Sequence, residues 1–282
     1  SAEAYQKIWW KEGSPLVVLT ERLRDALQAK MPENIEVAMR YGNPDPKTAY
    51  DNLLKKNPDL EEAVLVPLYP HYAMSSYETA VEYMKKIYAK NNYSFKLKIV
   101  PPFYNHPTYI NALAESMKPY LQNDFDQLLF SYHGIPKRHI FKTDKTHSEH
   151  DLHSLEKCCD NAAAQATCYR HQVIATTKLV TEKLGLDKSG YQISFQSRLG
   201  RDPWLKPNTQ ELLPTLPGSG VKKLLIASPA FVSDCLETLE ELDIRGREDF
   251  LASGGEAYTY IPCMNTNEVW VNALKEIIEE CE

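Results

Sequence analysis

Short apolar runs alternate with longer amphipathic stretches along the chain. The apolar runs predict strands at residues 35–39, 63–68, 95–100, 128–132, 191–196, 224–227 and 257–261. The stretches between them have apolar residues at helical spacing. They predict helices at residues 1–10, 15–30, 45–56, 76–90, 106–121, 166–184 and 267–280, and an acidic helix that begins at residue 233. Because strands that alternate with helices usually form a parallel sheet covered on both faces, the pattern predicts an α/β fold.

The two halves of the chain resemble each other. The sequence YINAL at 109–113 is similar to WVNAL at 270–274, and the same offset aligns 65–70 with 226–231. A slightly different offset aligns 40–42 with 198–200. Since the three matches occur in the same order, they predict two similarly wound α/β units.

The alignment of the halves also indicates a missing strand. The second half begins with the strand at 128–132, whereas the first half begins with a helix. The first strand of such a unit is usually central in its sheet. We therefore expect that the chain is a trimmed form of a longer protein and lacks its N-terminal strand.

Composition restricts the class of protein. The chain has 282 residues, 43% of them hydrophobic, and a net charge of -6. This charge does not favour nucleic acid or anionic lipid as a partner. We find no membrane-spanning run and no signal-peptide pattern. Six cysteines do not form an obvious disulfide framework, so we expect a cytoplasmic protein. The 17 tyrosines and four tryptophans are unusual and could line a flat aromatic pocket.

Three carboxylates follow the apolar run at 224–227. Asp234, Glu237 and Glu241 have the spacing i, i+3 and i+7, which places them on one face of an α-helix. If the run is a parallel strand, they lie near its carboxyl end, where open α/β sheets bind ligands. The alternative is an ordinary solvated helix face, which is the more common meaning of a lone acidic triplet.

His133 follows the strand at 128–132 and would face the same crevice. An imidazole titrates near neutral pH, so it can accept a proton or bind a metal. A histidine and a glutamate that face each other suit acid–base chemistry or capture of a divalent metal, although His133 could also be a hydrogen-bonded turn residue. The chain has no HExxH, Walker A, GxGxxG or GxSxG motif.

Other candidate ligand-binding residues also follow predicted strands. Trp204 lies in a proline-bounded loop, where a large ring more often lines a ligand than fills a core. Arg40, Arg198 and Arg201 could bind anionic groups, although a single arginine is more often part of a surface ion pair.

Several motifs together resemble those of the ferrochelatase family. They are SYHGIP at 131–136, FQSRLG at 195–200, PWL at 203–205, SDCLETLEE at 233–241, MRY at 39–41 and LYP at 68–70. The resemblance covers almost the whole chain, in the order of the family. It implies a chelatase-like fold in which two Rossmann-like domains enclose a cleft. It also implies an enzyme that inserts Fe²⁺ into protoporphyrin IX and forms protoheme in the last step of heme biosynthesis.

The resemblance further implies roles for individual residues. His133 and Glu237 would be catalytic, and Asp234 and Glu241 would join them in binding the metal. The porphyrin cleft would include Arg40, Tyr41, Tyr69, Pro70, Ser197, Arg198 and Trp204. Cys235 stands where some relatives have histidine. The first domain would comprise residues 1–122 with the C-terminal helix 266–282, and the second would comprise residues 123–265. A strand and a lid would precede Ser1 in the family, which leaves open whether this chain is active by itself.

The polar insert at 142–172 could bind a metal of its own. It contains Cys158, Cys159 and Cys168, with His147, His150, His153 and His171. Some ferrochelatases carry a [2Fe-2S] cluster on four cysteines. The insert has three cysteines, so a cluster here needs a histidine or a distant cysteine as its fourth ligand. Zinc accepts mixed cysteine and histidine ligands. The alternative is a surface insertion without a metal.

The residues are also compatible with alternatives for the function, the membrane contact and the assembly. The function could instead be insertion of cobalt or nickel into another tetrapyrrole, or binding of a tetrapyrrole without catalysis. Handling of a hydrophobic porphyrin is compatible with peripheral contact with a membrane. The oligomeric state does not follow from the sequence.

Overall fold

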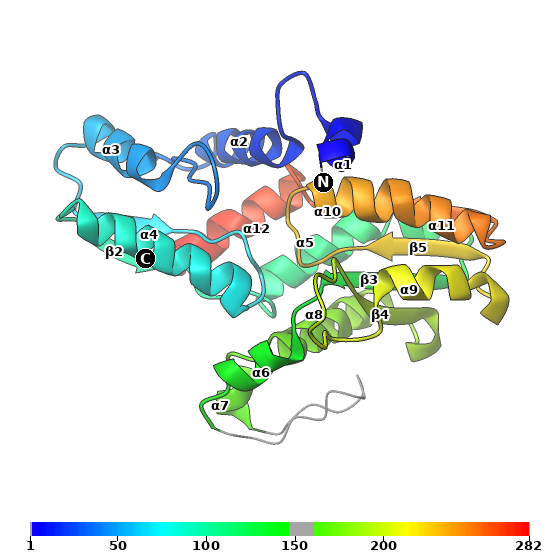
Figure 1. The fold of residues 1–282 in the computed structure, drawn as a ribbon. Coiled ribbons are helices and arrows are strands. Elements are labelled where there is room, and N and C mark those ends of the chain that lie inside the picture. The colour runs from blue at the N-terminus through cyan, green and yellow to red at the C-terminus, as the bar shows by residue number, and fades with distance from the viewer. Residues whose placement is uncertain (1, 147–160, 282) are drawn as a thin grey trace.

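The computed structural model describes residues 2–146 and 161–281, which form parallel sheets flanked by helices (Figure 1). The strands are β1 (Glu62–Leu65), β2 (Lys96–Ile99), β3 (Gln127–His133), β4 (Tyr191–Gln196), β5 (Lys223–Ala227) and β6 (Ala257–Tyr260). The α-helices are α1 (Ala2–Ile8), α2 (Pro15–Gln28), α3 (Pro46–Lys56), α4 (Thr79–Lys90), α5 (Pro107–Met117), α6 (Lys137–Thr143), α7 (Ala162–Gln165), α8 (Tyr169–Leu184), α9 (Thr209–Leu212), α10 (Leu236–Thr238), α11 (Arg247–Ala252) and α12 (Glu268–Glu279). The π-helices are η1 (Met74–Glu78) and η6 (Leu239–Gly246), and 3₁₀ turns are η2 (Tyr120–Gln122), η3 (Lys188–Gly190), η4 (Leu213–Thr215) and η5 (Pro217–Ser219). The predicted α/β fold is confirmed.

The sheet of the second half has the strand order β4-β3-β5-β6, and all its pairs are parallel. Leu128 and Phe130 of β3 face a core shared with α5, α8 and α12, whereas Leu129 faces a second core shared with η6 and α11. Both faces of the central strand are therefore covered, which explains its continuous apolar run.

The sheet of the first half repeats the pairing of the second. Glu62 of β1 pairs with Lys96 of β2, and Lys223 of β5 pairs with Ala257 of β6. β1 and β2 therefore correspond residue by residue to β5 and β6. The shift in residue number is the same one that aligns YINAL at 109–113 with WVNAL at 270–274. The internal similarity seen in the sequence is a similarity of strand register.

The predicted strand at 35–39 is wrong. The segment forms no strand, and the Ile35 amide donates instead to the Gln28 side chain at 2.9 Å. Its counterpart in the second half, β4, is held by pairing with β3. The described residues of the first half include no counterpart of β3, so the 35–39 segment has no neighbouring strand to pair with.

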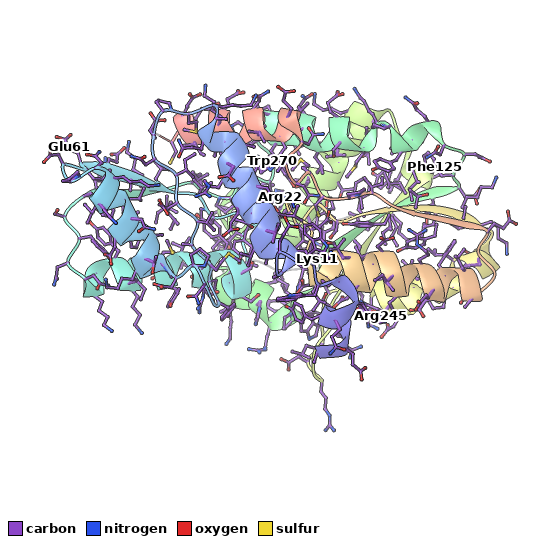
Figure 2. The ribbon with its side chains drawn as sticks, turned by 90° about the horizontal axis from the view of Figure 1, so that it is seen from above. Lys11, Arg22, Glu61, Phe125, Arg245 and Trp270 are labelled. Atoms are coloured by element: carbon purple, nitrogen blue, oxygen red, sulfur yellow. The ribbon has the colours of Figure 1, made fainter. Side chains whose placement is uncertain are left out.

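Helix α12 packs against α5 and α2 of the first half (Figure 1). Its Trp270, which Figure 2 labels, is fully buried with ring contacts to Tyr109 and Phe103 at 6.1 and 6.0 Å. The last helix thus lies against helices of the first half. The largest buried core contains residues of both halves, and the domain boundaries stay a prediction.

The acidic helix differs from its prediction. It begins at Leu236 with Cys235 as the N-cap, so Asp234 precedes it, and from Leu239 it continues as the π-helix η6. A π-helix has wider turns than an α-helix. Asp234, Glu237 and Glu241 therefore do not share one regular α-helical face, contrary to the prediction from their spacing.

Helix α1 lies against α10 and η6, although it is far from them in sequence (Figure 2). Lys7 of α1 is within 3.6 Å of the buried Glu240 carboxylate, which also pairs with Arg245 at 3.0 Å. Within 2–146 and 161–281, no helix has the length and apolar character needed to cross a membrane.

Candidate active site

A cavity of about 1710 Å³ lies between the two halves. Its lining includes Arg40, Tyr41, Tyr69 and His71 from the first half and His133, Trp204, Phe231 and Glu237 from the second. It continues along β1 to apolar residues of α2 and α12, among them Leu23 and Leu274. The carboxyl ends of β1 and β3 both open onto this cavity, which agrees with the expected position of a ligand in an α/β fold.

His133 ends β3, and its ring is held by its own loop. Its Nδ1 lies 2.6 Å from the Gly134 carbonyl oxygen. Because a carbonyl can only accept, Nδ1 carries a proton, and in the neutral ring Nε2 has the lone pair. Trp204 and Phe231 flank the imidazole with ring centroids at 6.5 and 6.3 Å. This tautomer suits Nε2 for accepting a proton or binding a metal.

Gly134 allows Trp204 to approach the His133 loop. A Cβ atom at Gly134 would lie 2.9 Å from the Gln196 carbonyl oxygen and 3.0 Å from Trp204 Cε3. The indole Nε1 of Trp204 is buried without a hydrogen-bond partner within the described part of the chain. A side chain at position 134 would thus displace the tryptophan that lines the cavity.

Glu241 is partly buried and is affected by the charges of His133 and Glu237, although it is not among the residues that line the cavity. Burial raises the pKa of the Glu241 carboxyl, and the charge of Glu237 raises it further. A hydrogen bond from Ser197 and the charges of Arg245 and His133 lower it. Ser197 Oγ is 2.7 Å from Glu241 Oε2, and Gln210 Nε2 is 3.2 Å from the same atom. The structure therefore places His133 and Glu237 on one cavity, while the predicted roles of His133, Glu237 and Glu241 stay predictions.

Asp234 has a different environment. Its Oδ1 accepts hydrogen bonds from Tyr260, Thr238 and the Cys263 amide at 2.6, 3.0 and 3.3 Å, and its Oδ2 accepts from Asn265 at 2.7 Å. The residue is buried and is not among those that line the cavity. These bonds tie the loop after β5 to the loop after β6. The predicted metal-binding role of Asp234 stays a prediction.

Arg40, Tyr41 and Tyr69 line the first-half side of the cavity. The Arg40 guanidinium lies over the Tyr41 and Tyr83 rings, with centroids at 4.6 and 4.4 Å. Its buried Nε has no partner among the described residues. Burial raises the pKa of Tyr69, and the neighbouring Tyr41 also raises it. Pro70 is buried but does not line the cavity.

Ser197 and Arg198 do not line the cavity themselves. Ser197 reaches the site only through Glu241, and its φ of 62° turns the chain away from the sheet. The side chain of Arg198 is exposed and pairs with Glu211 at 3.3 Å. Arg201 is also exposed. Of the three predicted arginines, Arg40 alone lines the cavity.

Two residues that the sequence did not single out lie at the site. Tyr5 of α1 lines the cavity, and its pKa is raised by burial and then by the charge of Glu237. His71 is almost fully buried, and burial lowers its pKa to about 3. Its Nε2 is 2.9 Å from Thr176 Oγ1 of the second half. Neither contact has a local sequence signal, because each partner is distant in the chain.

The proposed metal site of the insert is only partly described. Cys158, Cys159, His147, His150 and His153 lie outside the described residues. Cys168 is buried and His171 packs against Tyr104 at 6.3 Å. Residues 2–146 and 161–281 contain no group of three or more histidine, cysteine or acidic residues that could hold a metal ion. A [2Fe-2S] cluster or zinc ion in the insert stays a hypothesis.

Comparison with known proteins supports one family. The sequence model of the family Ferrochelatase matches residues 1–282. The ferrochelatase of Pseudomonas putida KT2440 is 43% identical over 99% of this chain and 83% of its own length. That of Pseudomonas fluorescens Pf0-1 is 45% identical over 99% of this chain and 82% of its own length.

Solved structures show the same fold. SirB from Bacillus subtilis with Fe³⁺ has a TM-score of 0.62 and 13% sequence identity, over 93% of this chain and 88% of SirB. The multi-domain protein DR2241 from Deinococcus radiodurans, which has structural similarity to chelatases, has a TM-score of 0.52 and 10% identity, over 94% of this chain and 51% of its own. At these identities the likeness concerns the fold alone.

Proposed function

Because this chain belongs to the ferrochelatase family, we propose that its reaction takes place in the cavity between the two halves and that His133 and Glu237 perform it. The chain is an enzyme of heme biosynthesis, a chelatase of the lyase class, that inserts Fe²⁺ into protoporphyrin IX to form protoheme. The insertion replaces two pyrrole protons by one Fe²⁺. The site must therefore bind a flat ring, accept protons and deliver a divalent cation.

His133 is the proton acceptor in this proposal. Its Nδ1–H is held by the Gly134 carbonyl, so the Nε2 lone pair is available to a pyrrole N–H or to iron. The rings of Trp204 and Phe231 lie 6.5 and 6.3 Å from the imidazole and restrict its position. This is the single observation that best supports His133 as the base, because the tautomer follows from a contact of the ring itself.

Glu237 and Glu241 form the path for iron and protons. The charges of Glu237 and His133 both act on Glu241, which supports a role for the three groups along one path. Carboxylate oxygens and an imidazole bind Fe²⁺ without the strong retention of a thiolate site. We assign Asp234 to support of this path rather than to iron itself, because its oxygens already accept four hydrogen bonds.

The porphyrin is bound by the aromatic and basic residues of the cavity. Trp204 and Tyr69 offer rings on opposite halves, and the free Nε of Arg40 is a donor for a carboxylate of the ligand. A planar macrocycle must bend before a metal can reach its nitrogens. Contacts with the rim of the ring are a source of binding energy for that distortion.

The alternatives have less support. Insertion of cobalt or nickel into another tetrapyrrole, and binding without catalysis, both lack the family match that favours ferrochelatase.

We propose that the two halves act as two Rossmann-like domains that close on the ligand. We also propose a cytoplasmic location with peripheral membrane contact, for which the exposed side chains of Trp9 and Tyr41 beside the cavity are candidates.

An anaerobic assay tests the function. The chain is mixed with Fe²⁺ and protoporphyrin IX, and heme is followed by its absorption. Heme should form faster than in buffer, and His133→Ala should lower the rate by about 100-fold or more, as expected for loss of a general base. His106→Ala is the control, because His106 does not line the cavity and pairs with Glu280 at 3.0 Å. An unchanged rate in His133→Ala would refute the assigned role.

The insert is tested separately. Freshly purified protein that contains neither iron nor zinc by elemental analysis, and shows no cluster absorption, would refute a resident metal. The proposed reaction needs no cofactor, since iron is a substrate.

A further inference from the structure

Gln196 connects the two elements that carry His133 and Glu237. It is the last residue of β4 and pairs in register with His133 of β3. Its carbonyl oxygen accepts from the Gly134 amide at 2.8 Å, and its side-chain Nε2 donates to the Glu237 carbonyl oxygen at 2.7 Å. Its main chain therefore holds the His133 loop while its side chain holds the first turn of α10.

The Glu237 carbonyl sets the orientation of the Gln196 amide, and buried hydroxyl groups match it. Ser131 Oγ donates to Gln196 Oε1 at 2.8 Å. Since that proton is used, Thr209 must donate to Ser131 Oγ, at 2.8 Å. Ser194 must then donate to Thr209, again at 2.8 Å. These hydrogen bonds all run in one direction and end with the bond from Gln196 Nε2 to the Glu237 carbonyl oxygen. Because a carbonyl can only accept, exchange of Oε1 and Nε2 in the Gln196 amide would place two acceptors against each other.

The network is fully buried. Ser131, Ser194, Gln196 and Thr209 have no exposed surface. A hydrogen bond in such surroundings is not exchanged for one with water, and linked bonds strengthen one another. The amide is therefore a rigid support rather than one of several equivalent contacts.

Glu237 lies in the first turn of a helical segment that continues from α10 into the π-helix η6. The position of its side chain therefore depends on where this first turn is held. The bond from Gln196 is a direct tie between the Glu237 main chain and the strand that pairs with His133.

We propose that Gln196 is a positioning residue that sets the place of Glu237 relative to His133. The proposal deepens the proposed function, because it assumes that these two residues act on the same substrate. Gln196 does not line the cavity, so it acts through Glu237 and not on the porphyrin.

The first test compares Gln196→Met with Ser194→Ala. Methionine keeps the length of the side chain but cannot donate to Glu237. Ser194→Ala removes the far end of the same buried network and leaves the Gln196–Glu237 bond in place.

We expect kcat to fall by about 10- to 100-fold in Gln196→Met, because misplacement by about 1 Å can lower a rate this much. The KM for porphyrin should be almost unchanged. Ser194→Ala should lower the melting temperature but keep kcat within about threefold of the unsubstituted chain. An unaltered kcat in folded Gln196→Met would overturn the proposal.

Gln196→Glu provides a pH readout. When protonated, the new carboxyl accepts from Ser131 and donates to the Glu237 carbonyl as the amide does; when ionised, it repels that carbonyl. Burial raises the pKa of a carboxyl, so the protonated form persists toward neutral pH. The rate of Gln196→Glu relative to the unsubstituted chain should rise as pH falls. A constant ratio would mean that the donor at this position does not matter, and would contradict the proposal.

Hydrogen exchange separates this inference from the proposed function. Peptides that cover residues 236–241 should exchange faster in Gln196→Met than in Ser194→Ala, whether or not the chain makes heme. If the unsubstituted chain makes no heme while this exchange difference is found, the proposed function fails and the positioning of Glu237 stands. Equal exchange in the two variants would refute the positioning role itself.

Discussion

The Ser197 hydroxyl donates a hydrogen bond to Glu241, with 2.7 Å between Ser197 Oγ and Glu241 Oε2. It links the end of β4 to the π-helix η6, and it opposes the rise in the Glu241 pKa that burial causes. Glu241 is thus kept closer to ionisation than its surroundings alone would allow. The proposed proton and iron path depends on that ionised carboxylate.

Ser197→Ala should move the acid limb of the pH–rate profile to higher pH. Loss of the donor raises the pKa of Glu241 further, so a higher pH is needed to ionise it. The measurement is the pH dependence of kcat for heme formation. Ser253→Ala serves as the control, since its hydroxyl only bonds the Asp249 carbonyl on an exposed helix end. An acid limb that does not move would remove Glu241 from the path.

Gly134→Ala should weaken both the fold and porphyrin binding. The new Cβ would meet the Gln196 carbonyl oxygen at 2.9 Å and Trp204 at 3.0 Å, so the indole must shift. We expect a loss of about 1–3 kcal/mol in the free energy of unfolding and weaker quenching of porphyrin fluorescence on binding. Gly218→Ala is the matched control, because no atom lies within 4 Å of its added Cβ. Normal binding by Gly134→Ala would mean that the position of Trp204 is not important for the ligand.

His71 should make stability depend on pH. Burial lowers its folded-state pKa to about 3, whereas in the unfolded chain it titrates near its ordinary value of 6.5. Between these values the unfolded chain binds a proton that the folded chain does not, so stability is complete above pH 6.5 and falls as pH decreases. The slope from one proton is about 1.4 kcal/mol per pH unit.

His71→Gln should remove this contribution. Thr176 donates its own proton to the Tyr104 carbonyl at 2.7 Å, so His71 must donate to Thr176 Oγ1. Glutamine does not titrate and can still donate this hydrogen bond. The free energy of unfolding in urea, measured from pH 4 to pH 7, should fall less steeply in the variant. Identical slopes would show that His71 is not the group responsible.

Arg40 and Arg198 should differ in their effect on porphyrin binding. Arg40 lines the cavity with a buried Nε that has no partner in the described part of the chain, whereas Arg198 is exposed and pairs with Glu211. Arg40→Ala should raise the KM for protoporphyrin about tenfold, as for one lost bond between a guanidinium and a carboxylate. Arg198→Ala should leave the KM unchanged. An equal effect of both changes would point to general charge rather than a specific contact.

The alternation of apolar runs and helical stretches was sufficient to predict the α/β fold and the strands β1 to β6, and three short sequence matches predicted the repeat that relates the halves. It also placed His133 at the carboxyl end of a central strand, because strand ends are marked locally by glycine and proline. Two local predictions were wrong. The 35–39 segment is not a strand because it lacks a neighbour, and the acidic helix begins later and widens to a π-helix, so the three carboxylates have different environments.

The sequence by itself therefore determined the order of the elements and the residue types available at the site. Only the tertiary structure decided which of them meet. Tyr5 lines the same cavity as Glu237, His71 bonds Thr176, and Gln196 connects the His133 loop to Glu237 through contacts between distant segments. Asp234 and Arg198 have suitable chemistry, but their partners lie outside the cavity. The physical reason is that periodicity reports burial along one element, whereas a site depends on distances between elements that the packing of the whole chain sets.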